Sequence, residues 1–102
     1  MSKEFKKTEY GEIEYNKWIR HKTFTTFIED VGYNPLVSKI LGNISTQQES
    51  EMVFNMTQIL FDFAHEEVTI SFFIVDNEYP DIQLSFDELR KIFSYAKKFV
   101  WR

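Results

Sequence analysis

Few side chains in this sequence are suited to catalysis. The chain has no cysteine and two histidines, His21 and His65, so a nucleophilic serine or threonine would need one of these histidines as its base. Neither histidine lies in a hydrolase or zinc-protease motif. The three glycines, at positions 11, 32 and 42, stand alone, so the sequence has no glycine-rich loop for phosphate groups. We therefore predict that the protein is not an enzyme and uses no cofactor.

One group of residues has the spacing of metal ligands. Asp62, His65 and Glu66 stand at positions i, i+3 and i+4, which places them on one face if this segment is helical. A fourth ligand is not identifiable, and acidic residues spaced in this way are ordinary on a solvated helix surface. We therefore predict no metal site.

The charged residues are segregated along the chain. Residues 23–89 contain twelve carboxylates and one base, Lys39, so the net charge of this stretch is −11. Residues 1–22 carry a net charge of +2 and residues 90–102 a net charge of +5. An acidic middle between basic ends influences which partners the folded chain can approach.

Several of the acidic residues lie where a fold would display them. Asp76, Glu78 and Asp81 cluster in one predicted turn, next to Tyr79, a residue type that is common in interfaces. Two further acidic pairs fall in the predicted first turns of helices. We predict that the partner-binding residues are Asp76, Glu78, Tyr79, Asp81, Asp87, Glu88, Glu49 and Glu51. If they form one continuous face, they can occupy a basic groove meant for DNA, which carries one phosphate charge per about 1.7 Å. The alternative is a solvated shell that keeps an aromatic-rich domain in solution.

These observations favour a small acidic protein that inhibits a partner without enzymatic activity. The expected partner is a protein with a basic surface, such as a nuclease or another effector that handles nucleic acid. Anti-CRISPR-like inhibitors from phages or mobile elements and immunity proteins against toxins are instances of this class. The alternative is a nucleic-acid-binding or regulatory module that uses two basic and aromatic clusters, residues 17–22 and 97–102. A sequence pI near 5.1 makes direct nucleic-acid binding the weaker hypothesis.

The length and composition indicate one domain, residues 1–102, with a substantial core. The chain has 102 residues, of which 43% are hydrophobic and eleven are phenylalanine. Its longest apolar run, Phe72–Val75, is far shorter than the roughly 20 residues that span a bilayer, and the N-terminus lacks the apolar core of a signal peptide. We expect a soluble cytoplasmic protein, monomeric or homodimeric, with no membrane association.

The second half of the chain shows three patterns. Apolar residues at three- and four-residue steps predict a long helix near 46–65, with a capping box formed by Ser45 and Gln48 or by Thr46 and Glu49. Residues 68–75 and 82–84, separated by a turn at 76–81, predict a hairpin near 68–84 whose two faces are both at least partly covered. A helix near 86–100 follows, with a capping box of Ser85 and Glu88.

The first 44 residues give weaker patterns. A short helix over 35–41 fits between Asn34-Pro35 and Gly42, and another helix ends near Gly32. Residues 4–20 fit either a hairpin that turns at Gly11 or a helix from about residue 12, and we favour the hairpin because it would extend the sheet. The predicted class is α+β, with an antiparallel sheet packed against the long helix near 46–65 and the C-terminal helix near 86–100.

Overall fold

The structure, a computed structural model, describes residues 7–32 and 35–101, with side chains from residue 11 onward. Within these residues it has four helices and four strands in one antiparallel sheet. In chain order the elements are α1 (Lys7–Trp18), α2 (Lys22–Asp30), α3 (Leu36–Thr46), β1 (Glu51–Val53), β2 (Thr57–Asp62), β3 (Glu67–Phe72), β4 (Ile82–Ser85) and α4 (Phe86–Phe99). The predicted α+β class is confirmed. Among the described residues, the helices are too short or too polar to span a bilayer.

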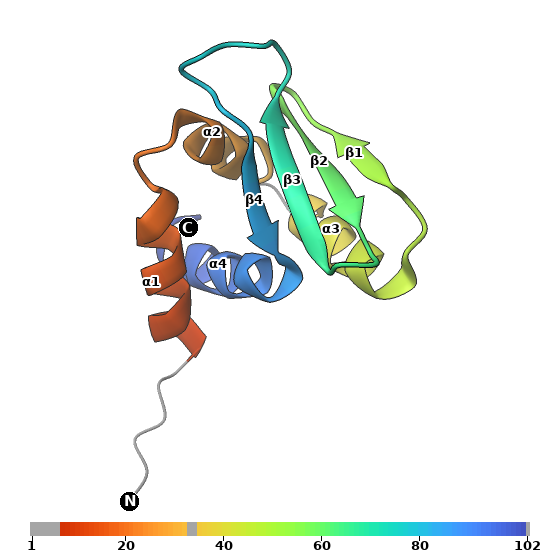
Figure 1. The fold of residues 1–102 in the computed structure, drawn as a ribbon. Coiled ribbons are helices and arrows are strands. Elements are labelled where there is room, and N and C mark those ends of the chain that lie inside the picture. The colour runs from red at the N-terminus through yellow and green to blue at the C-terminus, as the bar shows by residue number, and fades with distance from the viewer. Residues whose placement is uncertain (1–6, 33–34, 102) are drawn as a thin grey trace, which may run out of the picture.

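The sheet has the order β1-β2-β3-β4, and helices cover one of its faces (Figure 1). Alternation along the strands determines which side chains face these helices. Ile59 of β2 is paired with Ile70 of β3, and Ile70 with Ile82 of β4; all three are buried. The next residues along two of these strands, Leu60 and Gln83, are exposed on the opposite face. Side chains that are almost completely buried between the sheet and the helices are Phe24, Phe27, Val31, Val37, Ile40, Ile59, Val68, Ile70, Leu84, Leu89, Ile92 and Phe93.

The first helix packs closely against the last one. Gly11 of α1 is buried, and a Cβ atom at this position would lie 2.2 Å from the carbonyl oxygen of Lys91 in α4. Tyr15, one turn later in α1, contacts the ring of Tyr95, with 5.3 Å between the ring centroids. Gly11 therefore permits the close approach of two helix backbones, and Tyr15 continues the same contact.

The second helix is joined to the sheet through one carboxylate. Asp30, the last residue of α2, accepts three hydrogen bonds at its Oδ2 atom, from the backbone N–H of Met56 and from the backbone N–H and hydroxyl of Thr57. Each of the three is 2.8 Å long. Asp30 thereby satisfies the backbone at the start of β2, next to the turn that precedes it.

The prediction of a long helix near 46–65 is wrong, because this segment contains β1 and β2. Ile59 and Phe61 are buried while Leu60 between them is 39% exposed, an alternation that belongs to a strand. The expected capping boxes are also wrong, since Ser45 and Thr46 lie in the last turn of α3. The predicted hairpin near 68–84 is confirmed as β3 and β4. The C-terminal helix is confirmed as α4, and its capping box of Ser85 and Glu88 has both hydrogen bonds.

In the first 44 residues the predicted hairpin over 4–20 is wrong, because α1 occupies most of its described part. The helix that ends near Gly32 is confirmed as α2. The helix predicted over 35–41 continues through the exposed Gly42 to Thr46. Its end is determined by the buried Asn43, whose side chain binds the backbone of the next loop, and by Gln47 in the left-handed region at φ 57°. Residues 4–6 and Asn34, which belonged to these predictions, lie outside the described residues.

Candidate partner-binding surface

The connection between β3 and β4 contains half of the predicted partner-binding residues. We call residues 73–81 the docking loop; Figure 1 shows it at one end of the sheet. The backbone N–H of Phe73 donates to the carbonyl of Met56, so the loop starts as a continuation of the β2–β3 pairing. From there to Ile82 the chain leaves the sheet, and every loop residue except the half-buried Tyr79 is exposed.

Local contacts give the docking loop a defined shape. The ring of Tyr79 stacks on the ring of Phe72, with centroids 4.0 Å apart and an angle of 18° between the planes. The carboxylate of Asp76 accepts a hydrogen bond of 2.8 Å from the backbone N–H of Glu78. The carbonyl of Asp76 accepts another of 2.9 Å from the N–H of Tyr79. This is an aspartate-stabilised turn, which accounts for the residue types in this segment.

One cation connects the docking loop to the start of α2. The ammonium of Lys22 forms an ion pair with the carboxylate of Glu78 and lies 5.8 Å from the ring centroid of Tyr79. The hydrogen bond and the charge of Glu78 raise the pKa of Lys22 above its ordinary value. Both side chains are exposed, so this pair orients the loop more than it stabilises the fold. No ion pair of Asp76 or Asp81 occurs among the residues that the structure describes.

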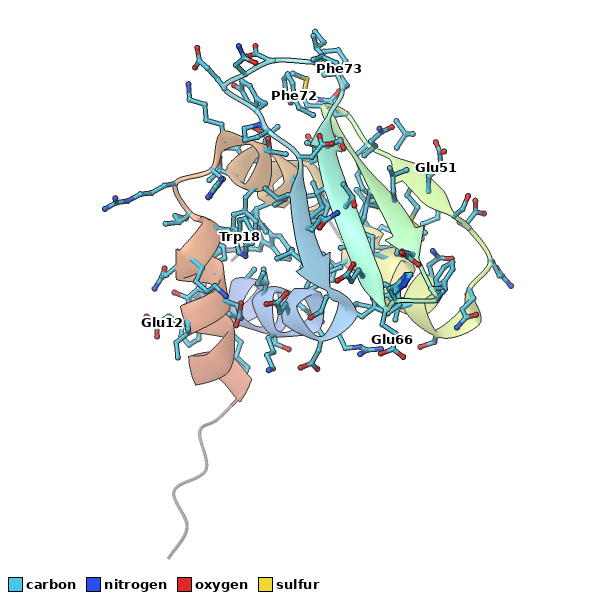
Figure 2. The ribbon with its side chains drawn as sticks, viewed as in Figure 1. Glu12, Trp18, Glu51, Glu66, Phe72 and Phe73 are labelled. Carbon is cyan, nitrogen blue, oxygen red and sulfur yellow. The ribbon has the colours of Figure 1, made fainter. Side chains whose placement is uncertain are left out.

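The docking loop begins with three apolar side chains that face solvent. Phe73 is 57% exposed, Ile74 54% and Val75 fully exposed, and Figure 2 shows Phe73 at the outer end of the sheet. The prediction that both faces of the 68–75 strand are at least partly covered is therefore wrong for its last three residues. Adjacent exposed apolar side chains are typical of interaction sites. The sequence interpretation missed them because it placed all three in the predicted strand over residues 68–75.

The acidic residues at the start of α4 serve the helix itself. The carboxylate of Glu88 accepts a hydrogen bond from the backbone N–H of Ser85 and lies 4.0 Å from the ammonium of Lys17. Asp87 forms an ion pair of 3.1 Å with Lys91, one turn later in the helix. Both residues lie where the helix dipole favours negative charge, as the sequence predicted.

The last acidic pair lies on neither helix start. Glu49 is in the loop after α3, where its backbone N–H and carbonyl bind the side chain of Asn43. Glu51 belongs to the edge strand β1, opposite Leu60 of β2. The expectation that this pair begins a helix is wrong, because α3 ends at Thr46 before it.

The structure thus groups four of the eight predicted residues and separates the other four. Asp76, Glu78, Tyr79 and Asp81 share the docking loop. That loop and the first turn of α4 lie at opposite ends of β4 (Figure 1), whose four residues span about 13 Å. Glu51 lies at the far edge of the sheet (Figure 2). The docking loop is therefore the surface on which acidic and exposed apolar residues coincide.

The residues with metal-ligand spacing lie at the end of β2, where Asp62 is the last residue, and in the turn that follows, which contains His65 and Glu66. Asp62 accepts a hydrogen bond of 2.8 Å from the ring of His65, and this contact raises the pKa of His65 and lowers that of Asp62. Glu66 adopts the left-handed conformation at φ 55°. In the described part of the chain no three acidic or histidine side chains are grouped so that they could hold a metal ion.

The basic and aromatic clusters of the alternative hypothesis are partly occupied by contacts within the chain. The ring of Trp18 contacts that of His21, with centroids 5.0 Å apart, and Lys22 is paired with Glu78. At the other cluster the indole N–H of Trp101 donates to the carbonyl of Ile28 at 3.1 Å.

No protein-family model, curated protein or solved structure matches the chain significantly.

Proposed function

We propose that this protein is a small non-enzymatic inhibitor that binds a partner protein through the docking loop. The partner has a basic surface, as a nuclease or another nucleic-acid-handling effector has, and binding blocks its groove. Anti-CRISPR-like inhibitors and toxin immunity proteins act in this manner. The observation that carries the proposal is the coincidence of three exposed apolar side chains, Phe73–Val75, with the carboxylates of Asp76 and Asp81 in one ordered loop.

The two kinds of side chain have different tasks in such a contact. Burial of exposed apolar groups contributes most of the affinity of a protein interface, because water is released from their surfaces. Carboxylates around them increase the rate of encounter with a basic surface and disfavour acidic partners. The stacked Tyr79 and the turn at Asp76 hold the loop in one shape, which reduces the entropy lost on binding.

Kinetic measurements on paired variants test the proposal. The partner is first captured from the native host's lysate with the unmodified protein and then purified. The double variant Asp76→Asn and Asp81→Asn removes two charges, and asparagine can still accept the hydrogen bond at position 76. The matched control, Glu12→Gln and Glu66→Gln, removes two charges from exposed residues away from the loop (Figure 2).

We expect the loop pair to lower the association rate about tenfold at low salt and to weaken its salt dependence. The third variant, Val75→Ser, should mainly raise the dissociation rate. If the loop pair and the control pair change the association rate equally, only the overall charge matters and the assigned surface is wrong. If the protein alone shifts labelled single-stranded DNA or RNA at low salt, the nucleic-acid-binding alternative replaces this proposal.

A further inference from the structure

A second surface of the molecule forms an open cleft of about 720 Å³. Its walls come from α1, α2 and the residues after α4. This volume lies within the range of about 300–1,000 Å³ that is usual for ligand-binding clefts. The surface of the cleft is polar and apolar in nearly equal parts. Two aromatic residues, Tyr15 and Trp101, and two polar ones, Thr25 and Glu29, are among the residues that line it.

Two aromatic rings are fixed at this cleft. Trp101 is held by its indole hydrogen bond to Ile28 and by contact with the ring of Phe93, 5.8 Å away between centroids. Tyr15 makes an edge-on contact with the ring of Phe24, with 5.3 Å between the ring centroids. Burial, and then the neighbouring Tyr95, raise the pKa of Tyr15, so its hydroxyl stays neutral. The cleft therefore presents aromatic surface in a fixed position.

Among the described residues that line the cleft, the ionic side chain is a carboxylate. Glu29 is exposed, forms no ion pair within the described chain, and is the one ionic side chain among the described residues that line the cleft. It lies in the last turn of α2, where the helix dipole also contributes negative potential. Aromatic faces and a carboxylate together favour a cation, because the ring quadrupole and the carboxylate attract the same charge. Val100, which is 38% exposed, adds aliphatic surface for an uncharged stem.

We infer that the cleft binds an arginine side chain of the partner protein. A guanidinium stacks on aromatic rings and pairs with a carboxylate through two parallel hydrogen bonds, and its three-carbon stem suits an apolar wall. Lysine has a compact, strongly hydrated ammonium and fits this combination less well. The inference rests on the proposed function for the source of the arginine.

The cleft lies close enough to the docking loop for one partner protein to contact both. Lys22 at the start of α2 contacts the docking loop, and Glu29 lies seven residues later in the same helix. At a rise of 1.5 Å per residue these positions are about 10 Å apart along the helix axis. A partner of ordinary interface size, which covers about 800 Å² per side, can contact the docking loop and the cleft at the same time.

A titration with blocked arginine (N-acetyl-arginine-N-methylamide) tests the inference without the partner. The readout is the NMR signal of the Trp101 indole N–H, which is distinguished from the signal of the only other tryptophan by the variant Trp18→Phe. The neutral control ligand is the corresponding blocked citrulline, which has nearly the same shape. We expect a saturable shift with blocked arginine and about tenfold weaker binding of citrulline and of blocked lysine.

Variants separate this cleft from the docking loop. Glu29→Gln should weaken the binding of blocked arginine about tenfold, whereas Glu12→Gln on the exposed surface of α1 and Asp76→Asn in the docking loop should leave it unchanged. Equal binding of arginine and citrulline, or an unchanged affinity in Glu29→Gln, would overturn the inference. Binding of agmatine at least tenfold tighter than that of blocked arginine would assign the cleft to a free small guanidine and refute the partner as the source. The titration contains no partner protein. Its result can therefore be interpreted even if the docking-loop proposal fails.

Discussion

Removal of the Asp30 carboxylate tests most directly how α2 is held against the sheet. In the variant Asp30→Ala, the N–H groups of Met56 and Thr57 and the Thr57 hydroxyl all lose their acceptor. Thr57 is 1% exposed, so water cannot easily replace the lost bonds there. A hydrogen bond to a charged group contributes about 1.5–3 kcal/mol, and a buried donor without a partner costs a similar amount. Because Met56 is half-buried and can regain water, we predict a total loss of about 3–5 kcal/mol.

Urea unfolding measures this loss, and the slope of the transition shows whether the unfolded and native states stay comparable. Thr57→Val removes one of the three hydrogen bonds and should cost about 1 kcal/mol. A double-mutant cycle with Asp30→Ala should show coupling, because both variants delete the same contact. Glu29→Ala, the neighbouring exposed carboxylate, is the matched control and should change stability by less than about 0.5 kcal/mol. If Asp30→Ala costs no more than Glu29→Ala, or if the Thr57 amide exchanges with solvent no faster, the structural argument is refuted.

Three further predictions concern α1, α4 and the turn between β2 and β3. Gly11→Ala should lower the melting temperature because its methyl group collides with the backbone of α4. Gly42→Ala should stabilise α3 by about 0.5–1 kcal/mol, because an added Cβ at this position meets no atom within 4 Å outside the helix's own nearby backbone. Equal effects of the two variants on stability would contradict the close contact between α1 and α4. Ser85→Ala should cost about 1 kcal/mol in chemical denaturation and Ser85→Asp much less, since aspartate also caps helices. NMR titration should give His65 a pKa above the ordinary histidine value, and Asp62→Asn should lower it. The stabilisation by this contact is present while Asp62 is ionised and His65 is protonated; it is lost as pH rises through the raised pKa of His65 and as pH falls through the lowered pKa of Asp62.

The second half of the chain shows why hydrophobic periodicity gave a correct class and one wrong element. The α4 pattern was unambiguous, because its apolar stripe coincides with a capping box whose residues lie at the correct spacing. Between Met52 and Phe63 the apolar residues fit a helix as well as two short strands, because Ile59 and Leu60 are adjacent and both apolar. The structure resolves this ambiguity through pairing with β3, a contact that local spacing does not encode.

In the first half the decisive contacts join residues that are far apart in sequence. Gly11 looked like a turn residue, but its role is the approach of α1 to Lys91, eighty residues later. Asp30 and Asn43 were not distinguished from other polar residues, although each binds the backbone of a following segment. The sequence shows an excess of carboxylates. It does not show which carboxylates bind groups of the same chain and which are free to contact a partner, because that depends on residues distant in sequence.

This difference determines how the charge of the middle segment bears on function. The net charge of −11 over residues 23–89 includes Asp30, Asp87 and Glu88, whose carboxylates bind groups of the same chain. Inhibition by many carboxylates on one face, in imitation of a nucleic acid, is therefore supported less than the sequence suggested, since the predicted residues lie on three parts of the fold. A small contact in which exposed apolar side chains supply the affinity fits this distribution better, because charges at the rim of an interface act mainly on the rate of encounter. On this argument, truncation of Phe73–Val75 should affect the lifetime of the complex more than its rate of formation, and neutralisation of the loop carboxylates should do the opposite.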